Sequence, residues 1–198
     1  MDFKVLSNKY IFKNRHITIH KNKTTRLVFI TRNGLVIKLA KLNPSFTIKR
    51  IKYQLKRFGF KAMLYDAFIE NPKIVTSIRF SLFRGILANH YEYQFWKKER
   101  LEVCMPSSFS LLGLVNIQSF GKTYKIAGDS IWSRMIEELP YSSDIQKEAH
   151  TFGEEDNYGV YKNNLKLLDY GSKEAQSILR EYKTPIIQIL YKTKFKLI

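Results

Sequence analysis

The sequence has very little cysteine and no long apolar run. Cys104 is the only cysteine among 198 residues, which excludes an intrachain disulfide and a zinc site built from a cysteine cluster. Scarce thiols are typical of a reducing compartment, so we expect a cytoplasmic protein, or a virion-associated one if it is viral. No stretch has the roughly 20 apolar residues that span a bilayer, and the first ten residues lack a signal-peptide core. We therefore expect no membrane partner.

Acidic residues are half as frequent as basic ones, and the imbalance is greatest at the N-terminal end. The chain has 34 Lys and Arg against 17 Asp and Glu, a net charge of +17. Residues 1–60 hold 15 basic and 1 acidic residue, a net +14, whereas residues 121–160 hold 4 basic and 8 acidic residues, a net −4. Such a field attracts nucleic acid, nucleotide phosphates or acidic protein surfaces, and charge alone does not choose among them.

Strand and turn signals predict an antiparallel sheet near the N-terminus. Residues 16–20 (HITIH) alternate as in a half-buried strand. The segments RLVFI and LVIKLA flank TRNG, where Asn33 and Gly34 favour the positive φ angles of a tight hairpin. Later, the apolar run Phe109–Gln118 predicts a single buried strand, and YGVY and LKLLDY predict a second hairpin around residues 162–164.

Helical signals lie between and after these strands. Asn43 and Pro44 predict an N-cap and a first helical residue, and Gly59 ends or kinks that helix. Residues 75–100, most of 128–150 and 173–183 are also helical in pattern, and the last eight residues predict an edge strand. The expected helix core positions are Phe46, Ile51, Leu55, Phe58, Ile78, Leu82, Ile86 and Tyr93.

This order predicts an α+β protein with two lobes. We expect a β-rich N-terminal lobe over residues 1–118, with a basic helical insertion at 43–72. We expect a reduced, mainly helical C-terminal lobe with a β-hairpin over residues 119–198.

Two oxygen-bearing side chains stand at the ends of the second predicted hairpin. Asn157 starts its first strand, and Asp169 ends its second strand twelve residues later. Because the two ends of a hairpin lie side by side, we expect an amide oxygen next to a carboxylate, a pair suited to Mg²⁺ with phosphate oxygens completing the shell. Gly171 allows a sharp turn after them. An ordinary hairpin with polar ends is the alternative for this segment alone.

A lysine in an apolar strand and a glutamate on a later helix form the second pattern. Lys38 lies within GLVIKLA and is either an edge-strand lysine that discourages aggregation or a phosphate-binding lysine oriented by a glutamate. Glu92 lies among aromatic residues, so we expect it to face inward, within ion-pair reach of Lys38. Glu99 lies among charged residues and is expected in solvent.

In this order the motifs resemble the protein-kinase-like fold, and in particular divergent small kinase-like proteins of bacteriophages. Lys38 is similar to the strand lysine, Glu92 to its helix partner, Asn157 to the metal-binding Asn, and Asp169-Tyr170-Gly171 to Asp-Phe-Gly. Residues 101–118 resemble the strands that lead to the interlobe hinge. The resemblance spans about residues 26–172 and implies ATP bound through Lys38 and Glu92, and Mg²⁺ through Asn157 and Asp169.

Two departures from that family favour a pseudokinase. No Gly-x-Gly-x-x-Gly loop precedes Lys38, and Phe152 stands where the family has its catalytic aspartate, five residues before the metal-binding Asn. His150, Glu154, Glu155 and Asp156 are the possible substitutes, and Asp156, next to Asn157, is our candidate catalytic residue. Weak or absent phosphotransferase activity is therefore expected.

Five basic residues accompany the first predicted helix: Lys49, Arg50, Lys52, Lys56 and Arg57. A solvated helix face explains them equally well as a contact with a nucleic-acid backbone or an acidic protein surface. Two functions remain open. One is a degenerate kinase-like protein that binds ATP and Mg²⁺ and docks a partner through this basic face. The alternative is a basic structural or nucleic-acid-binding protein, virion-associated and without catalysis.

Overall fold

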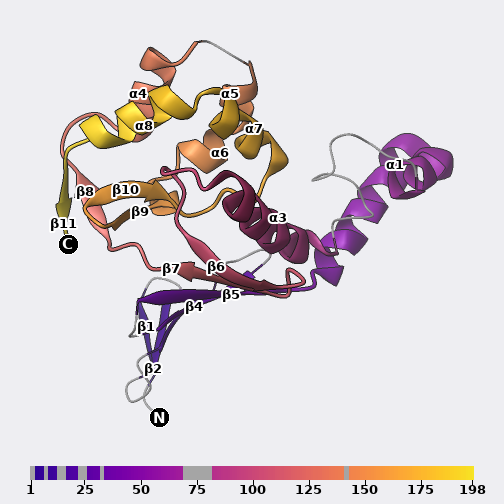
Figure 1. The fold of residues 1–198 in the computed structure, drawn as a ribbon. Helices are drawn as coiled ribbons and strands as arrows, with labels where there is room; N and C mark the ends of the chain where they lie inside the picture. The colour runs from indigo at the N-terminus through magenta and orange to yellow at the C-terminus, as the bar shows by residue number, and fades with distance from the viewer. Residues whose placement is uncertain are drawn as a thin grey trace.

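The computed structural model describes residues 3–6, 9–12, 17–21, 26–31, 34–68, 82–140 and 143–198. It shows an antiparallel sheet built mostly from the N-terminal part of the chain, and a group of short helices around a β-hairpin built from the C-terminal part (Figure 1). The expected α+β class is confirmed.

The larger sheet has seven strands in the order β1-β2-β3-β4-β5-β7-β6, all antiparallel. They are β1 (Phe3–Leu6), β2 (Lys9–Phe12), β3 (Ile17–Lys21), β4 (Arg26–Thr31), β5 (Leu35–Ala40), β6 (Ser107–Leu111) and β7 (Val115–Ser119). The predicted β4–β5 hairpin is confirmed, and Gly34 has the expected positive φ of 72°. Asn33 lies outside the described residues.

The expected single strand over Phe109–Gln118 is wrong. Leu112 and Gly113 adopt φ angles of 49° and 76° and form a tight turn that separates β6 from β7. A Cβ on Gly113 would lie 2.2 Å from the carbonyl oxygen of Ile86, so only glycine fits this turn. The sequence did not reveal this turn because the residues around it are apolar and suggest a buried strand. Leu112 at the tip of the turn is nevertheless 79% exposed.

Helix α1 (Pro44–Phe68) follows β5 and projects away from the sheet (Figure 1). The predicted cap is confirmed, since the Asn43 side-chain oxygen accepts the Phe46 backbone N–H at 3.2 Å. The predicted interruption is also confirmed, because Gly59 has φ 79° and ψ 175° within the helix. No described helix is long and apolar enough to cross a membrane.

The expected apolar core face of α1 is wrong. Phe46, Leu55 and Phe58 are exposed and Ile51 is only half-buried, because the helix projects from the protein instead of packing along it.

Helix α3 (Arg84–Glu99) lies against one face of the sheet. Its buried residues are Gly85, Asn89, Glu92 and Phe95, so the expected core positions Leu82, Ile86 and Tyr93 are wrong: all three are only half-buried. Two of the inward positions, Asn89 and Glu92, are polar because the side chains of the sheet that face them are polar too. Ile78 lies outside the described residues.

The C-terminal part consists of short elements. They are β8 (Tyr124–Ile126), α4 (Ile131–Glu138), α5 (Ser143–Lys147), α6 (Ala149–Phe152), the 3-10 helix η2 (Glu155–Asn157), β9 (Tyr158–Tyr161), β10 (Asn164–Leu167), α7 (Lys173–Glu181), α8 (Lys183–Lys192) and β11 (Phe195–Leu197). The predicted second hairpin is β9–β10, turned by Lys162 and Asn163 at positive φ. The predicted strand over the last eight residues is shorter, because Tyr191 and Lys192 belong to α8, which the sequence did not predict.

The main apolar core lies in this C-terminal part, and its largest fully buried side chains include Phe152, Leu165, Leu179 and Ile189. The chain leaving β7 packs directly against the hairpin. Lys122 and Val160 exchange backbone hydrogen bonds of 2.9 and 3.0 Å, and a Cβ on Gly121 would lie 2.8 Å from the Cα of Gly159. Two glycines therefore allow the linker and hairpin backbones to touch.

Candidate functional site

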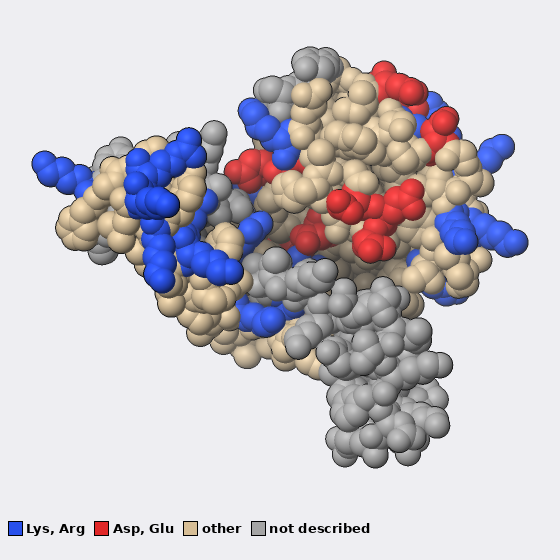
Figure 2. Space-filling model, turned by 180° about the vertical axis from the view of Figure 1, so that it is seen from behind, with Lys and Arg blue, Asp and Glu red and all other residues tan. Residues whose placement is uncertain are grey.

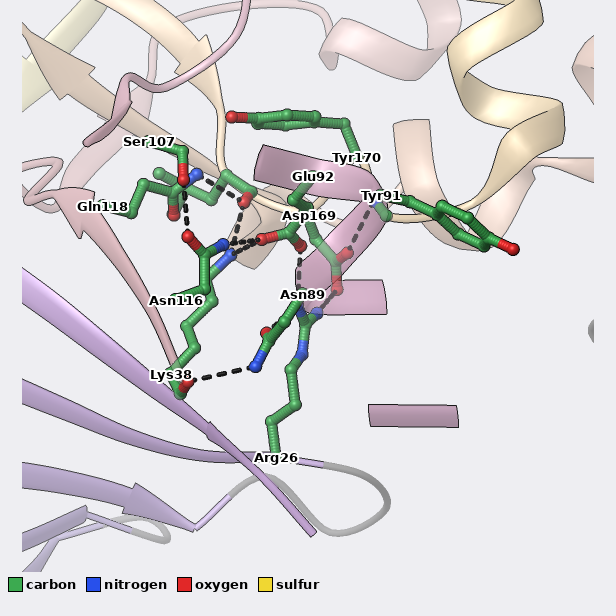
Figure 3. Close-up of polar contacts among 12 residues, drawn as sticks. Arg26, Lys38, Asn89, Tyr91, Glu92, Ser107, Asn116, Gln118, Asp169 and Tyr170 are labelled. Atoms are coloured by element: carbon green, nitrogen blue, oxygen red, sulfur yellow. Dashed lines mark hydrogen bonds and ion pairs between the residues drawn. The ribbon is translucent and has the colours of Figure 1, made fainter. Parts of the chain in front are cut away.

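The sheet face that meets α3 carries polar side chains. In β4, β5 and β7 the inward side chains include Arg26, Lys38, Asn116 and Gln118, all of them buried (Figure 3). They share one face because directly paired residues of antiparallel strands point the same way, as Lys38 and Asn116 do. Buried polar groups need partners, and Asn89 and Glu92 of α3 supply several of them.

Lys38 and Glu92 form the predicted ion pair. Lys38 Nζ lies 2.8 Å from Glu92 Oε2, and their side chains are 7% and 0% exposed. Lys38 also donates to the backbone oxygen of Leu168 at 2.8 Å, next to Asp169. Burial lowers the pKa of Lys38, and Glu92 opposes that shift only in part. The edge-strand interpretation of Lys38 is wrong, because β5 lies between β4 and β7.

Arg26 is the site residue that the sequence did not reveal. Its Nη1 lies 2.6 Å from Glu92 Oε1 and its Nη2 lies 2.6 Å from Asp169 Oδ2, so one guanidinium bridges two carboxylates (Figure 3). Burial opposes the charge on Arg26, but Asp169 and Glu92 outweigh it and raise its pKa. The pairing register of β4 with β5 could have identified Arg26 in advance. Val28 pairs with Lys38, so Arg26, two residues before Val28, lies on the same face of the sheet as Lys38.

Asp169 thus joins the same cluster as Lys38 and Glu92. Its side chain is 42% exposed, so it lies at the open edge of the cluster, whereas Arg26 is 5% exposed. Burial acts to raise the pKa of Asp169, but the positive charges of Arg26 and Lys38 outweigh it and hold the pKa below its usual range. Asp169 therefore remains a carboxylate at neutral pH.

The two ends of the hairpin meet through their backbones at Asn157 and Leu168, whereas the described contacts of the Asn157 and Asp169 side chains are with other residues. The Leu168 N–H donates to the Asn157 backbone oxygen at 2.6 Å. The Asn157 side-chain NH₂ donates to the backbone oxygens of His150 and Thr151, both at 3.0 Å, so its oxygen is the atom that can bind a ligand. The described residues contain no group of three His, Cys, Asp or Glu side chains arranged for a metal. These two residues would therefore hold Mg²⁺ only with phosphate or water oxygens.

The Tyr170-Gly171 pair fixes Asp169 in place. Tyr170 is fully buried, its hydroxyl donates to the Met105 backbone oxygen at 2.6 Å, and its ring packs against Phe95 with centroids 5.9 Å apart. A Cβ on Gly171 would lie 2.9 Å from the Ala88 backbone oxygen, so the chain passes closely along α3. This close passage brings Asp169 beside residues of α3 and β4.

The candidates for a catalytic base lie elsewhere. Phe152 is 1% exposed in the apolar core, where its backbone oxygen accepts the Tyr158 hydroxyl at 2.9 Å. The possible substitutes are all exposed: His150, Glu154, Glu155 and Asp156. Within the described contacts, none of the four bonds to Lys38, Glu92 or Asp169. The structure therefore does not bring Asp156 into the ionic cluster.

Helix α1 carries the predicted basic residues on its surface. Lys49, Lys52, Lys56 and Arg57 are exposed and Arg50 is half-buried. Figure 2 shows this projecting part covered by Lys and Arg, while the Asp and Glu side chains in view gather on the body. The Arg57 guanidinium lies 5.7 and 5.4 Å from the ring centres of Tyr53 and Phe58. Charge and aromatic surface therefore occur together on α1.

The kinase-like interpretation thus depends on a few contacts within this chain: Lys38 with Glu92, and both with the end of the hairpin at Asp169. No protein-family model, curated protein or solved structure matches the chain.

Proposed function

We propose that the chain is a two-lobed, kinase-like nucleotide-binding protein with little or no phosphotransferase activity. The single observation that carries this proposal is the buried Lys38–Glu92 ion pair, whose lysine also contacts the backbone beside Asp169. In protein kinases these residue types bind the phosphates, orient the lysine and hold the metal. Here Lys38 would bind ATP phosphates, Glu92 would orient Lys38, and Asn157 and Asp169 would supply oxygens for Mg²⁺.

Weak or absent catalysis follows from the surroundings of the hairpin. Phosphoryl transfer depends on positioning and on neutralising charge, so a lysine and a metal site alone would support slow chemistry. An efficient kinase also needs a group that positions the attacking hydroxyl, and Phe152 at that position is buried in the core. Asp156 would serve only if its exposed 3-10 helix moved toward the phosphates.

Nucleotide binding is tested by the effect of ATP and Mg²⁺ on the melting temperature. We expect ATP to raise the melting temperature, because a ligand that binds only the folded state stabilises it by mass action. Lys38→Met should abolish the shift, whereas Glu137→Gln, which changes an exposed carboxylate on α4, should leave it intact. An unchanged melting temperature for the wild-type protein at millimolar ATP would contradict the proposal.

The exposed basic surface of α1 favours a second function, the docking of a partner. A projecting helix with four exposed basic side chains suits a nucleic-acid backbone or an acidic protein surface, and on its own would also fit a virion-associated structural protein. A salt titration of DNA and RNA binding separates the partners. If the partner is a nucleic acid, the affinity should fall steeply as the salt concentration rises. If neither DNA nor RNA binds at low salt, an acidic protein surface is the favoured partner.

The matched variants for this test carry equal charge changes. Replacing Lys49, Lys52, Lys56 and Arg57 by glutamine should reduce both the affinity and its salt dependence. Replacing Lys122, Lys125, Lys194 and Lys196 by glutamine removes four exposed charges from the body and should change binding far less. Equal losses in both variants would show that net charge, and not α1, determines binding.

A further inference from the structure

We propose that Arg26 takes the place of a divalent cation at Asp169, so that the site binds a nucleoside polyphosphate without a metal ion. This inference rests on the proposed nucleotide binding, but it removes the requirement for Mg²⁺ in that binding. It assigns a role to a residue that neither the sequence motifs nor the resemblance identified.

The first observation is the position of the guanidinium. Arg26 Nη2 lies 2.6 Å from Asp169 Oδ2, one of the two oxygens that Asp169 could offer a metal, and Nη1 lies 2.6 Å from Glu92 Oε1. Arg26 belongs to strand β4, and its guanidinium contacts Glu92 of helix α3 on one side and Asp169, which follows the hairpin, on the other (Figure 3). A permanent positive charge on the protein thus neutralises the carboxylate that would bind the metal.

The second observation is that both buried cations have donors left over. Arg26 is 5% exposed, and among the described residues its Nε is buried without an acceptor. Lys38 has three donors and two described acceptors, Glu92 and the Leu168 backbone oxygen. Buried donors without acceptors are rare, so this arrangement lacks an acceptor that a ligand can supply. Arg50 and Arg134 also have an unpaired Nε, but both side chains are partly exposed to water.

The chemistry of that acceptor follows from the donors. Guanidinium and ammonium groups with spare N–H donors bind phosphate oxygens through short, charge-assisted hydrogen bonds. Arg26 and Lys38 lie on adjacent strands of one sheet face and share Glu92, with the half-exposed Asp169 at the edge, so a ligand that entered past Asp169 would need several phosphates to contact both of these nearly buried cations. A polyphosphate fits better than a single phosphate for this reason.

The third observation concerns charge. Arg26 occupies Oδ2 of Asp169, so a divalent cation could bind only Oδ1 unless it displaced the guanidinium, and at either oxygen it would lie close to the positive charges of Arg26 and Lys38. Like charges in a buried site repel strongly, and a buried charge that loses its partner is unfavourable. Arg26 and a metal therefore compete for Asp169. Arg26 has the advantage because it is part of the chain and is always present at the site.

The test compares ATP with excess EDTA, ATP with Mg²⁺, and Mg²⁺ alone on the full-length wild-type protein. We expect the same rise in melting temperature with EDTA as with Mg²⁺, dissociation constants that agree within about threefold by calorimetry, and no shift with Mg²⁺ alone. A rise that requires Mg²⁺ would overturn the role of Arg26 and leave the proposed nucleotide binding standing. No rise in either ATP condition would overturn both.

Variants of Arg26 test the same role by removing or replacing the guanidinium. Arg26→Ala frees Asp169, so ATP binding should become dependent on Mg²⁺, and Mn²⁺ should bind to the protein, as detected by water proton relaxation. Arg26→Lys keeps a positive charge and should retain metal-independent binding. Arg134→Ala, which removes another arginine with an unpaired Nε, serves as the control and should behave as the wild type. Because Arg26→Ala removes a buried charge, unfolding of that variant would leave the wild-type and Arg26→Lys measurements to decide.

Discussion

The molecule has two interiors with opposite chemistry. The C-terminal core consists of apolar side chains such as Leu165, Leu179 and Ile189, whereas the space between the sheet and α3 holds Arg26 and the Lys38–Glu92 pair. Burial of apolar surface stabilises a fold directly. Burial of ions contributes little net stability, because the loss of hydration offsets the attraction between them. The apolar core therefore accounts for stability, and the ionic interior is better explained by what it can bind.

The largest effect is expected from removing the central carboxylate of the ionic interior. Glu92→Gln keeps the shape but leaves Lys38 and Arg26 each without one ionic partner, which should lower the free energy of unfolding by about 3–5 kcal/mol. Denaturant unfolding measures this loss. A double variant that also replaces Lys38 by methionine should lose less than the two single variants together, and simple additivity would show that the pair is not coupled.

An apolar truncation in the other interior tests the contrast. Leu179 is fully buried, so Leu179→Ala should cost about 2–5 kcal/mol through lost contacts and a cavity. Unlike Glu92→Gln, it should leave the ATP dissociation constant of the folded protein unchanged at a temperature well below its unfolding transition. Calorimetry at that temperature provides the comparison. Equal effects of the two variants on ATP binding would remove the functional distinction between the interiors.

A smaller effect is expected from acid. Asp169 has its pKa held below the unfolded value, so its contribution to stability is present above the unfolded pKa and is lost as the pH falls from about 5 toward 2. Asp169→Asn lacks this titration. Unfolding curves across that range should therefore converge for the two proteins as the pH falls, and curves that stay parallel would show that Asp169 is not stabilised by Arg26.

The smallest effect on stability is expected from α1. Lys52→Gln with Lys56→Gln changes two exposed side chains on a helix that projects from the body, so the free energy of unfolding should change by less than about 0.5 kcal/mol. The same variant should weaken binding to a polyanion such as heparin, judged by the salt concentration needed for elution. A large loss of stability would mean that these lysines have a structural partner.

Local signals in the sequence predicted much of the fold. The Asn43 cap, the kink at Gly59 and both hairpins depend on the backbone preferences of a few neighbouring residues, and each was predicted correctly. The turn at Leu112 and Gly113 was missed because its flanking residues are apolar. Helix α8 was missed because residues 184–190 were assigned to no element, and only its last two residues lay within the predicted tail strand. The first of these errors arises where hydrophobic pattern and turn chemistry disagree.

The site was predictable only where residue types resemble a known arrangement. Lys38, Glu92 and Asp169 were expected to meet, and they do. Arg26 was not expected, because its role depends on the pairing register of β4 with β5 and on the path of the chain past α3. The core positions of α1 and α3 were wrong for a similar reason: helical periodicity gives a face but does not say whether that face meets a polar surface, an apolar surface or solvent.

The contact between Gly121 and Gly159 bears on how the site can open. The linker that leaves the sheet touches the hairpin backbone there, and the hairpin continues through ten residues to Asp169. Opening the site would also have to break contacts at the other end of the hairpin, where the Leu168 backbone oxygen accepts hydrogen bonds from Lys38 and Gln118. An alanine at Gly121 or Gly159 would force the linker and hairpin backbones apart, and we expect it to displace Asp169 from Arg26 and Lys38 although neither glycine belongs to the ionic cluster.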